Sequence, residues 1–189
     1  MKFLNHNHKE FNIAHFQGTS SEVFTKFLDD IKSRNLDALP DDITLLSIWT
    51  TDEKCILYQQ LKNNNIEIVN GYIPREEKWS NPYKITCILE SLKNIKTKYT
   101  IILDGYDVVI NSWDHIIEKF LNYNADIVFN TSKNNYPPYF GDVVDTGNIS
   151  KFKYLNAGCC IGYTDKLIDF YNEVADYYEK HPTNKWNSE

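Results

Sequence analysis

Two carboxylates with a glycine between them follow the most regular apolar run of the chain. Residues 99–103 predict a buried strand, and Asp104, Gly105 and Asp107 come directly after it. Mg²⁺ and Mn²⁺ prefer oxygen ligands, and Mg²⁺ is commonly held by one or two carboxylates together with substrate phosphates. Residues at an odd offset point to opposite faces of a straight strand. Asp104 and Asp107 can therefore share an ion only if the backbone turns at Gly105.

The same residues also fit a different structure. Asp-Gly between two apolar runs is a strong local signal for a β-hairpin with a primed turn. In a plain two-stranded ribbon, the two carboxylates would point apart. Residues 99–110 alone leave both structures open, and a second motif is needed to choose between them.

That second motif is the apolar run 154–163, which contains Asn156, Gly158 and Gly162. Glycine inside a strand indicates a close approach of a ligand or of another backbone. The asparagine amide offers both a donor and an acceptor to sugar hydroxyl groups. The alternative is a bulged core strand with a structural asparagine.

Strands and helices alternate through most of the chain. Strands are expected at 43–49, 66–69, 99–103, 126–129 and 154–163, and helices at 53–63, 81–95, 113–121 and from Thr164 onward. This alternation predicts one α/β domain over residues 1–189 with a mainly parallel sheet. Residues 1–42 are poorly placed, apart from a short strand at 11–16 and a helix that a capping box opens at Thr19. The polar loop 131–152 has the length of a functional loop.

Composition excludes several classes of protein. The net charge of −6 argues against broad nucleic-acid binding, which needs a cationic surface. No secretory leader and no apolar stretch of membrane-spanning length is visible, so a cytoplasmic location is expected. The four cysteines, Cys55, Cys87, Cys159 and Cys160, lack the spacing of a zinc site and predict buried free thiols. Cys159 and Cys160 should face opposite sides of their strand.

Together, the strand that ends in Asp-x-Tyr-Asp and the later Leu-Asn-Ala-Gly motif resemble a known family. They are similar to the glycosyltransferase domain of the procollagen lysyl hydroxylases and to related collagen galactosyl- and glucosyltransferases. The resemblance covers residues 43–164 and includes the aromatic and proline-containing loop between the two motifs. It implies the GT-A fold, a Rossmann-like sheet flanked by helices, and Mn²⁺- or Mg²⁺-dependent transfer of a sugar from a UDP-sugar to a hydroxyl acceptor. A collagen-like protein acceptor is likewise suggested by the resemblance.

The resemblance also implies roles for individual residues. Asp104 and Asp107 are expected to bind the metal. The residues expected to bind the nucleotide sugar are Thr50, Trp79, Lys84, Tyr106, Asn156 and Gly158. Tyr136 and Pro137 are expected on the acceptor side. Asn156 and Glu189 are the catalytic candidates, and Asp142 and Asp145 are further candidates for orienting the acceptor.

Several of these residues have simpler alternatives. Tyr106 could be a core tyrosine, Lys84 a solvated helix charge and Thr50 an N-cap. Trp79 is better explained by packing within its loop.

The resemblance has one departure at its C-terminal side. Related enzymes continue with an acidic segment and a histidine that completes the metal site, whereas this sequence ends at Glu189. The C-terminal part of the family domain is therefore expected to be absent. A non-catalytic GT-A-like binding module, or an inactive short form, is the alternative to an active transferase.

Overall fold

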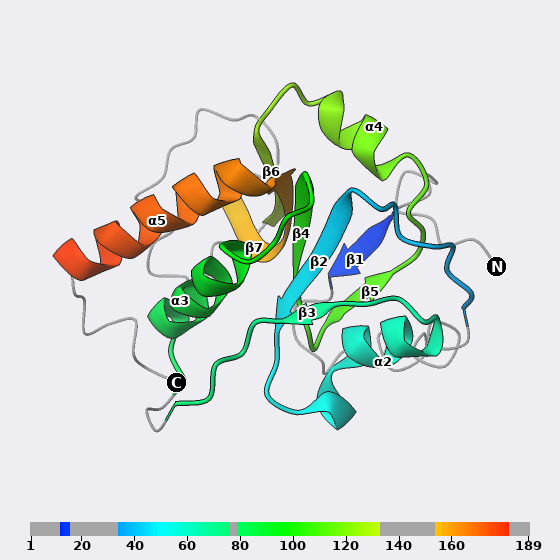
Figure 1. The fold of residues 1–189 in the computed structure, drawn as a ribbon, viewed down its shortest axis with the longest axis horizontal. Helices are drawn as coiled ribbons and strands as arrows, with labels where there is room; N and C mark the ends of the chain where they lie inside the picture. The colour runs from blue at the N-terminus through cyan, green and yellow to red at the C-terminus, as the bar shows by residue number, and fades with distance from the viewer. Residues whose placement is uncertain (1–11, 16–33, 76–78, 133–153, 182–189) are drawn as a thin grey trace.

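The computed structural model describes residues 12–15, 34–75, 79–132 and 154–181 (Figure 1). Seven strands are present in this part of the chain: β1 Ile13–His15, β2 Ile43–Ile48, β3 Val69–Asn70, β4 Tyr99–Asp104, β5 Val108–Ile110, β6 Ile127–Ser132 and β7 Tyr154–Tyr163. The helices are the 3₁₀ turn η1 Asp52–Lys54 and the α-helices α2 Ile56–Asn63, α3 Asn81–Leu92, α4 Ile116–Leu121 and α5 Thr164–Lys180. The expected short strand near the N-terminus is therefore confirmed as β1. The expected helix at Thr19 lies outside the described residues.

The central sheet has the strand order β3-β2-β4-β7-β6. β2 pairs in parallel with both β3 and β4, whereas β7 pairs antiparallel with both β4 and β6. Four strands thus run in one direction, and β7 runs against them between β4 and β6. The α/β prediction is confirmed, but the sheet is mixed, with two parallel and two antiparallel pairings, so the expected mainly parallel arrangement is not confirmed. The sequence did not predict the direction of β7, because an apolar run has the same pattern whichever way the strand runs.

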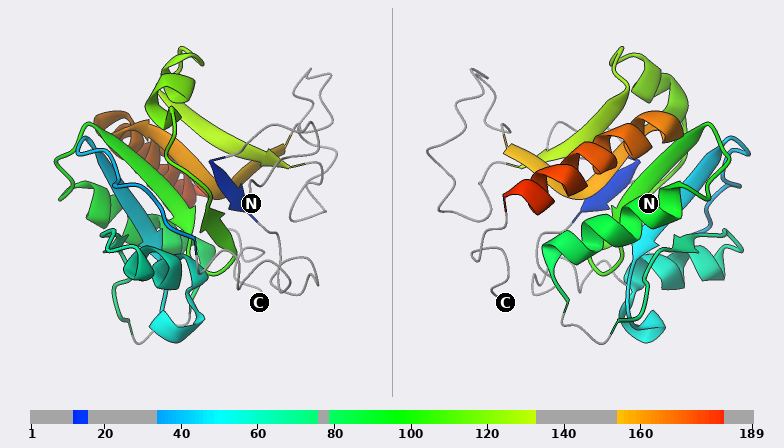
Figure 2. Two further views of the ribbon diagram at one scale, coloured as in Figure 1. Left: turned by 90° about the vertical axis from the view of Figure 1, so that its right-hand side faces the viewer. Right: turned by 60° about the vertical axis from the view of Figure 1, so that its left-hand side comes forward.

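Helices cover both faces of the sheet (Figure 2). On one face, Leu46, Ile48, Ile102 and Cys160 pack against α3 and α5. On the other face, Leu45, Ile101 and Leu103 pack with residues of α2, β5 and α4. Neighbouring residues of one strand alternate between these two cores, as the two-residue period of a strand requires. The opposite orientation of Cys159 and Cys160 follows the same rule, because each packs with a different core.

Helices α3 and α5 begin at the expected residues, Asn81 and Thr164. Ser80 caps α3, because its side chain accepts a hydrogen bond from the Tyr83 amide at 3.3 Å. Thr164 is the first residue of α5, and its hydroxyl lies 2.8 Å from that of Thr100 in β4. The helix expected at 53–63 divides into η1 and α2, with Cys55 between them.

The other boundaries shift by a few residues. Strand β3 covers only Val69–Asn70, whereas a strand was expected at 66–69. Helix α4 begins at Ile116 rather than near Trp113. Strand β6 continues to Ser132. Most of the predicted loop 131–152 lies outside the described residues. Among the described helices, none combines the length and the apolar composition that crossing a bilayer requires.

Candidate active site

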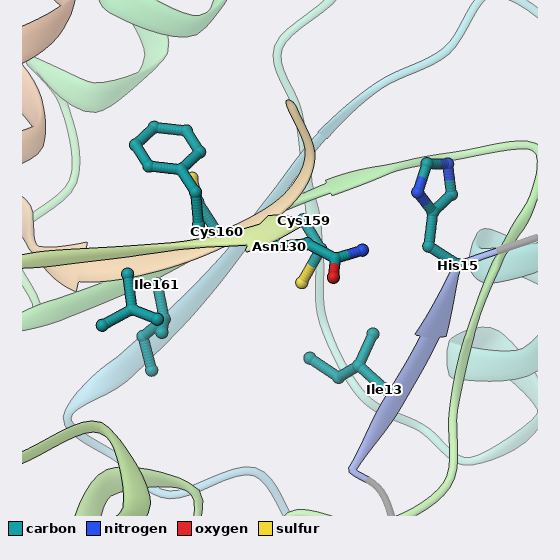
Figure 3. A pocket seen from close by; sticks show the side chains of 8 residues that line it. Ile13, His15, Asn130, Cys159, Cys160 and Ile161 are labelled. Atoms are coloured by element: carbon teal, nitrogen blue, oxygen red, sulfur yellow. The ribbon is translucent and has the colours of Figure 1, made fainter. Parts of the chain in front are cut away.

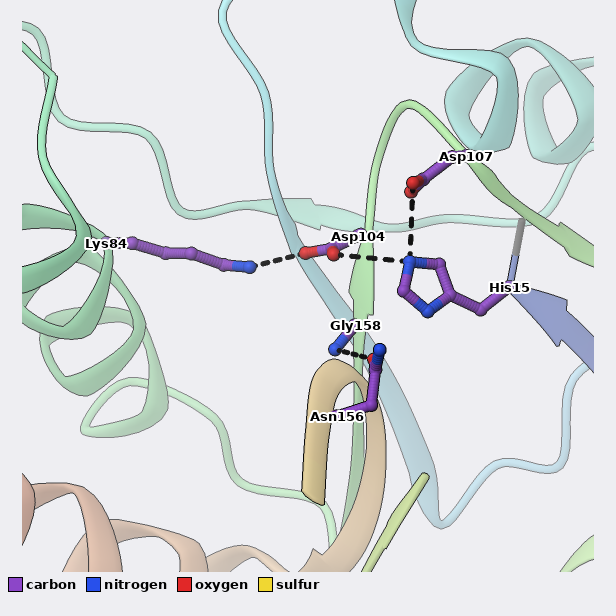
Figure 4. Close-up of polar contacts among 6 residues, drawn as sticks. All are labelled: His15, Lys84, Asp104, Asp107, Asn156 and Gly158. Atoms are coloured by element: carbon purple, nitrogen blue, oxygen red, sulfur yellow. Dashed lines mark hydrogen bonds and ion pairs between the residues drawn. The ribbon is translucent and has the colours of Figure 1, made fainter. Parts of the chain in front are cut away.

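The backbone turns sharply after β4, as a shared metal site requires. β4 ends at Asp104 and β5 begins at Val108, but β5 pairs with β1 and not with β4. The hairpin alternative is therefore wrong for this segment. We call residues 104–107 the Asp104 turn. Both of its carboxylates face the imidazole of His15 (Figure 4).

Gly105 lets the Asp104 turn lie close to the core. A Cβ atom at this position would be 2.9 Å from Cys55 Sγ and 3.2 Å from Trp49 Cβ. The Gly105 carbonyl accepts hydrogen bonds from the Leu57 amide at 3.2 Å and from the Cys55 thiol at 3.1 Å. These two hydrogen bonds from the beginning of α2 therefore hold the turn in place.

Cys55 connects this helix end to the turn. Its sulfur accepts a hydrogen bond from the Tyr58 amide at 3.4 Å while the thiol donates to Gly105. Burial raises the pKa of the Cys55 thiol to about 11, so the thiol keeps its proton at neutral pH. All four cysteines are free, as expected, and Cys159 alone among them is only half-buried.

Lys84 approaches the turn from α3. Its ammonium group pairs with Asp104 Oδ1, and both side chains are mostly buried, at 25% and 30% exposed. Lys84 is therefore not a purely solvated helix charge. The pairing leaves Asp104 Oδ2 directed toward His15 at 3.6 Å, so the two oxygens of one carboxylate face two different basic side chains.

Tyr106, within the Asp104 turn, contacts Thr50, which follows β2. The Tyr106 hydroxyl accepts a hydrogen bond from the Thr50 amide at 2.9 Å, and the two hydroxyls are also 2.9 Å apart. Thr50 caps neither η1 nor α2, whose caps are Thr51 and Cys55. Tyr106 is half-buried, and its ring packs against the core on this side of the sheet.

Trp79 belongs to a neighbouring aromatic cluster. Its ring centroid is 5.5 Å from that of Tyr83 and 6.3 Å from that of Tyr72. The side chain is 45% exposed, so packing within the loop leaves a large part of the indole accessible.

Strand β7 bends beside the turn. Its pairing with β6 changes register, because Phe129 is opposite Cys160 whereas Asn130 is opposite Asn156. We call residues 156–159 the β7 bend. Asn156 Oδ1 accepts a hydrogen bond from the Gly158 amide at 2.8 Å and holds the bend together. The alternative of a bulged strand with a structural asparagine therefore describes the local backbone correctly.

Gly158 provides the space in which His15 lies. A Cβ atom at Gly158 would be only 2.2 Å from His15 Cε1 and 2.6 Å from His15 Nδ1. The close approach that this glycine predicts is thus the approach of an imidazole from β1. Gly162, in contrast, accommodates a backbone, since its Cβ would lie 3.0 Å from the Asp126 carbonyl oxygen.

His15 is the site residue that the sequence did not indicate. Its Nε2 is 3.3 Å from Asp107 Oδ2, and its side chain is 6% exposed. Burial lowers its pKa, but the hydrogen bond to Asp107, the charges of both aspartates and a hydrogen bond with Asn156 outweigh burial and raise it. A histidine in a short expected strand was the only available signal. Nothing in the local sequence connects it to residues so distant along the chain.

A small pocket opens beside His15 on the sheet face (Figure 3). Its volume is about 180 Å³, and Ile13, Phe129, Asn130 and Cys159 are among its lining residues. Burial raises the pKa of the Cys159 thiol to about 12, with the charge of Asp104 adding to the effect. Typical small-molecule sites occupy roughly 300–1,000 Å³, so this pocket is smaller than such a site.

The remaining predicted residues cannot be placed. Tyr136, Pro137, Asp142, Asp145 and Glu189 all lie outside the described residues, and their roles stay predictions. The described part brings together six residues of the site at one edge of the sheet: His15, Lys84, Asp104, Asp107, Asn156 and Gly158 (Figure 4).

Comparison with protein families identifies the chain. The family described as PLOD GT domain matches residues 75–180, which is more than half of the 189 residues. The matched region contains Lys84, the Asp104 turn and the β7 bend, whereas Thr50 and His15 precede it. A comparison with curated proteins found no match. The chain belongs to the family of PLOD glycosyltransferase domains.

Proposed function

We propose that this chain transfers a sugar from a UDP-sugar to a hydroxyl group of an acceptor, with a divalent cation bound at the Asp104 turn. The observation that carries the proposal is the convergence of Asp104 and Asp107, which the turn at Gly105 makes possible. A mixed sheet with helices on both faces is compatible with the GT-A fold. The family match supports a glycosyltransferase-type domain.

The residues of the turn fit a hard cation. Asp104 and Asp107 are 30% and 18% exposed, so their carboxylates are accessible from the edge of the sheet. Bound there, Mn²⁺ or Mg²⁺ would act as a Lewis acid and stabilise the charge on a departing diphosphate. Lys84 holds Asp104 from the opposite side and supplies a second positive charge for the same phosphates.

The rim formed by Thr50 and Tyr106 is the proposed nucleoside side. Their hydroxyl groups contact each other and are able to exchange that contact for one with a ribose or base. The exposed part of Trp79 offers an additional aromatic surface. Asn156 and Gly158 border the site where a donor sugar would lie, although the Gly158 amide already donates to Asn156.

The acceptor side is proposed from the sequence alone. Tyr136 and Pro137 would contact the acceptor, and Asn156 and Glu189 are the proposed catalytic residues. A protein or glycan hydroxyl, including one on a collagen-like protein, is the proposed acceptor class.

A thermal-stability titration tests the donor site. UDP should stabilise the protein in the presence of Mn²⁺ by roughly 2.7 kcal/mol at 100 times its dissociation constant, and much less in EDTA. Asp104→Asn should remove the Mn²⁺-dependent shift with little loss of stability. A severe folding defect in that variant, or a wild type without any shift, would contradict the assignment.

Release of UDP separates transfer from binding alone. Long incubation of the chain with UDP-sugars and Mn²⁺ should liberate UDP, because water can replace the acceptor slowly. A Mn²⁺-dependent stability shift without any UDP release would instead identify a non-catalytic binding module.

A further inference from the structure

His15 reaches the Asp104 turn from a part of the chain that the family match does not include. β1 pairs antiparallel with β5, and in this register His15 is opposite Val108, the residue that follows Asp107. The backbone pairing of the two strands therefore places the imidazole beside the turn. Asn12 strengthens this placement, because its amide donates to the Ser112 and Asp114 carbonyl oxygens at 3.0 Å each.

The three side chains have the spacing of a metal site. One ligand atom from each of His15, Asp104 and Asp107 lies within 4.8 Å of the other two. His15 Nε2 is 3.3 Å from Asp107 Oδ2 and 3.6 Å from Asp104 Oδ2. In an octahedral site with bonds of ~2.1 Å, neighbouring ligand atoms are separated by about 3.0 Å. Movements of a fraction of an ångström would therefore bring these atoms to ligand distances.

The surroundings of the imidazole support a fixed ligand. The side chain is 6% exposed, and Gly158 leaves the space that the ring fills. Asn156 Oδ1 accepts a hydrogen bond from the Gly158 amide at 2.8 Å, so the bend that leaves this space is itself held in place.

We infer that His15 Nε2 is the third protein ligand of the divalent cation that Asp104 and Asp107 hold. The inference rests on the cation of the proposed function. It also defines a preference among metals, since an imidazole nitrogen favours Mn²⁺ over Mg²⁺ more than a third oxygen would. The metal then joins β1 to the matched region, because its ligands come from both.

Pulsed electron paramagnetic resonance of bound Mn²⁺ tests this directly. The wild type should show a ¹⁴N coupling from a directly bound imidazole, and His15→Ala should lose it. His115→Asn is the matched control, because His115 is an exposed histidine at φ 55°, a conformation that asparagine tolerates. This control should keep both the coupling and the Mn²⁺ affinity.

Binding titrations provide the quantitative test. His15→Ala should weaken Mn²⁺ binding at least tenfold and weaken Mg²⁺ binding less. His15→Glu, whose carboxylate reaches about as far as the imidazole Nε2 and replaces nitrogen with oxygen, should restore binding of both ions without the preference for Mn²⁺. Circular dichroism and thermal melting in EDTA establish that each variant is folded. The ¹⁴N coupling is measured on the wild type, so that test remains valid even if a variant fails to fold.

The outcomes separate the two proposals. Wild-type protein that binds Mn²⁺ at Asp104 without a ¹⁴N coupling, or a folded His15→Ala that binds it equally well or more tightly, would overturn the role of His15 alone. The imidazole would then be only an ion-pair partner of the aspartates. Wild-type protein that binds no divalent cation would overturn the proposed metal-dependent function and this inference with it.

Discussion

Two glycines interrupt strands at the candidate site, but their neighbours differ. Gly105 in the Asp104 turn faces Cys55, Trp49 and Ser47, all of them buried side chains of the core. Gly158 in the β7 bend faces the ring of His15. The first glycine lets the site lie against the core, and the second admits a side chain that belongs to the site.

Because of this difference, added side-chain atoms at the two glycines should affect different properties, stability in one case and ligand binding in the other. Crowding at Gly105 must be relieved by moving closely packed core atoms, which costs stability. Crowding at Gly158 is relieved by moving an imidazole at the end of its side chain. We therefore expect folding to depend mainly on Gly105, and ligand binding mainly on Gly158.

The largest expected effect is the loss of stability in Gly105→Ala. The added methyl would lie 2.9 Å from Cys55 Sγ and 3.2 Å from Trp49 Cβ, and overpacking of this kind costs roughly 1–3 kcal/mol. Urea unfolding followed by fluorescence measures the change. An unchanged free energy of unfolding would show that the turn is not supported by the core in the way we describe.

Gly158→Ala should have a smaller effect on stability and a specific effect on metal binding. The methyl would lie 2.2 Å from His15 Cε1, so the ring must leave its place beside Asp107. We expect Mn²⁺ affinity to fall about tenfold, which is typical when the orientation of a metal ligand is disturbed. Isothermal titration calorimetry measures the affinity.

Gly162→Ala is the matched control on the same strand. Its methyl would meet the Asp126 carbonyl oxygen at 3.0 Å, away from His15, so stability should fall while Mn²⁺ affinity stays unchanged. Equal effects of the Gly158 and Gly162 variants on Mn²⁺ affinity would remove the distinction between site and core.

The smallest expected effect is a loss of stability at alkaline pH that depends on Cys55. Burial raises its pKa from 9.0 to about 11, so the unfolded chain releases the proton first as the pH rises. The contribution is fully present below pH 9 and is lost between pH 9 and 11. Between pH 8 and 9.5, the free energy of unfolding should fall further in the wild type than in Cys55→Ser. The extra loss should be somewhat below ~1 kcal/mol. Equal pH profiles of unfolding free energy in the two proteins would contradict a buried, protonated thiol that donates to Gly105.

Local sequence patterns predicted the elements that carry the aspartates, but not the complete site. The apolar runs before Asp104 and around Gly158 were sufficient for the two strands. The turn at Gly105 was favoured over a hairpin only by the family resemblance that the two motifs carry together. The direction of β7 and the position of His15 depend on pairing between distant segments, which local periodicity does not encode. The pairing of β1 with β5 brings His15, from the N-terminal part of the chain, to the two aspartates.

Anomalous diffraction from crystals grown with Mn²⁺ and UDP tests the central claim most directly. We predict one manganese peak between Asp104, Asp107 and His15, with the diphosphate on the side of Lys84. A peak bound elsewhere, or a structure in which the two aspartates point apart while UDP is bound, would contradict the account.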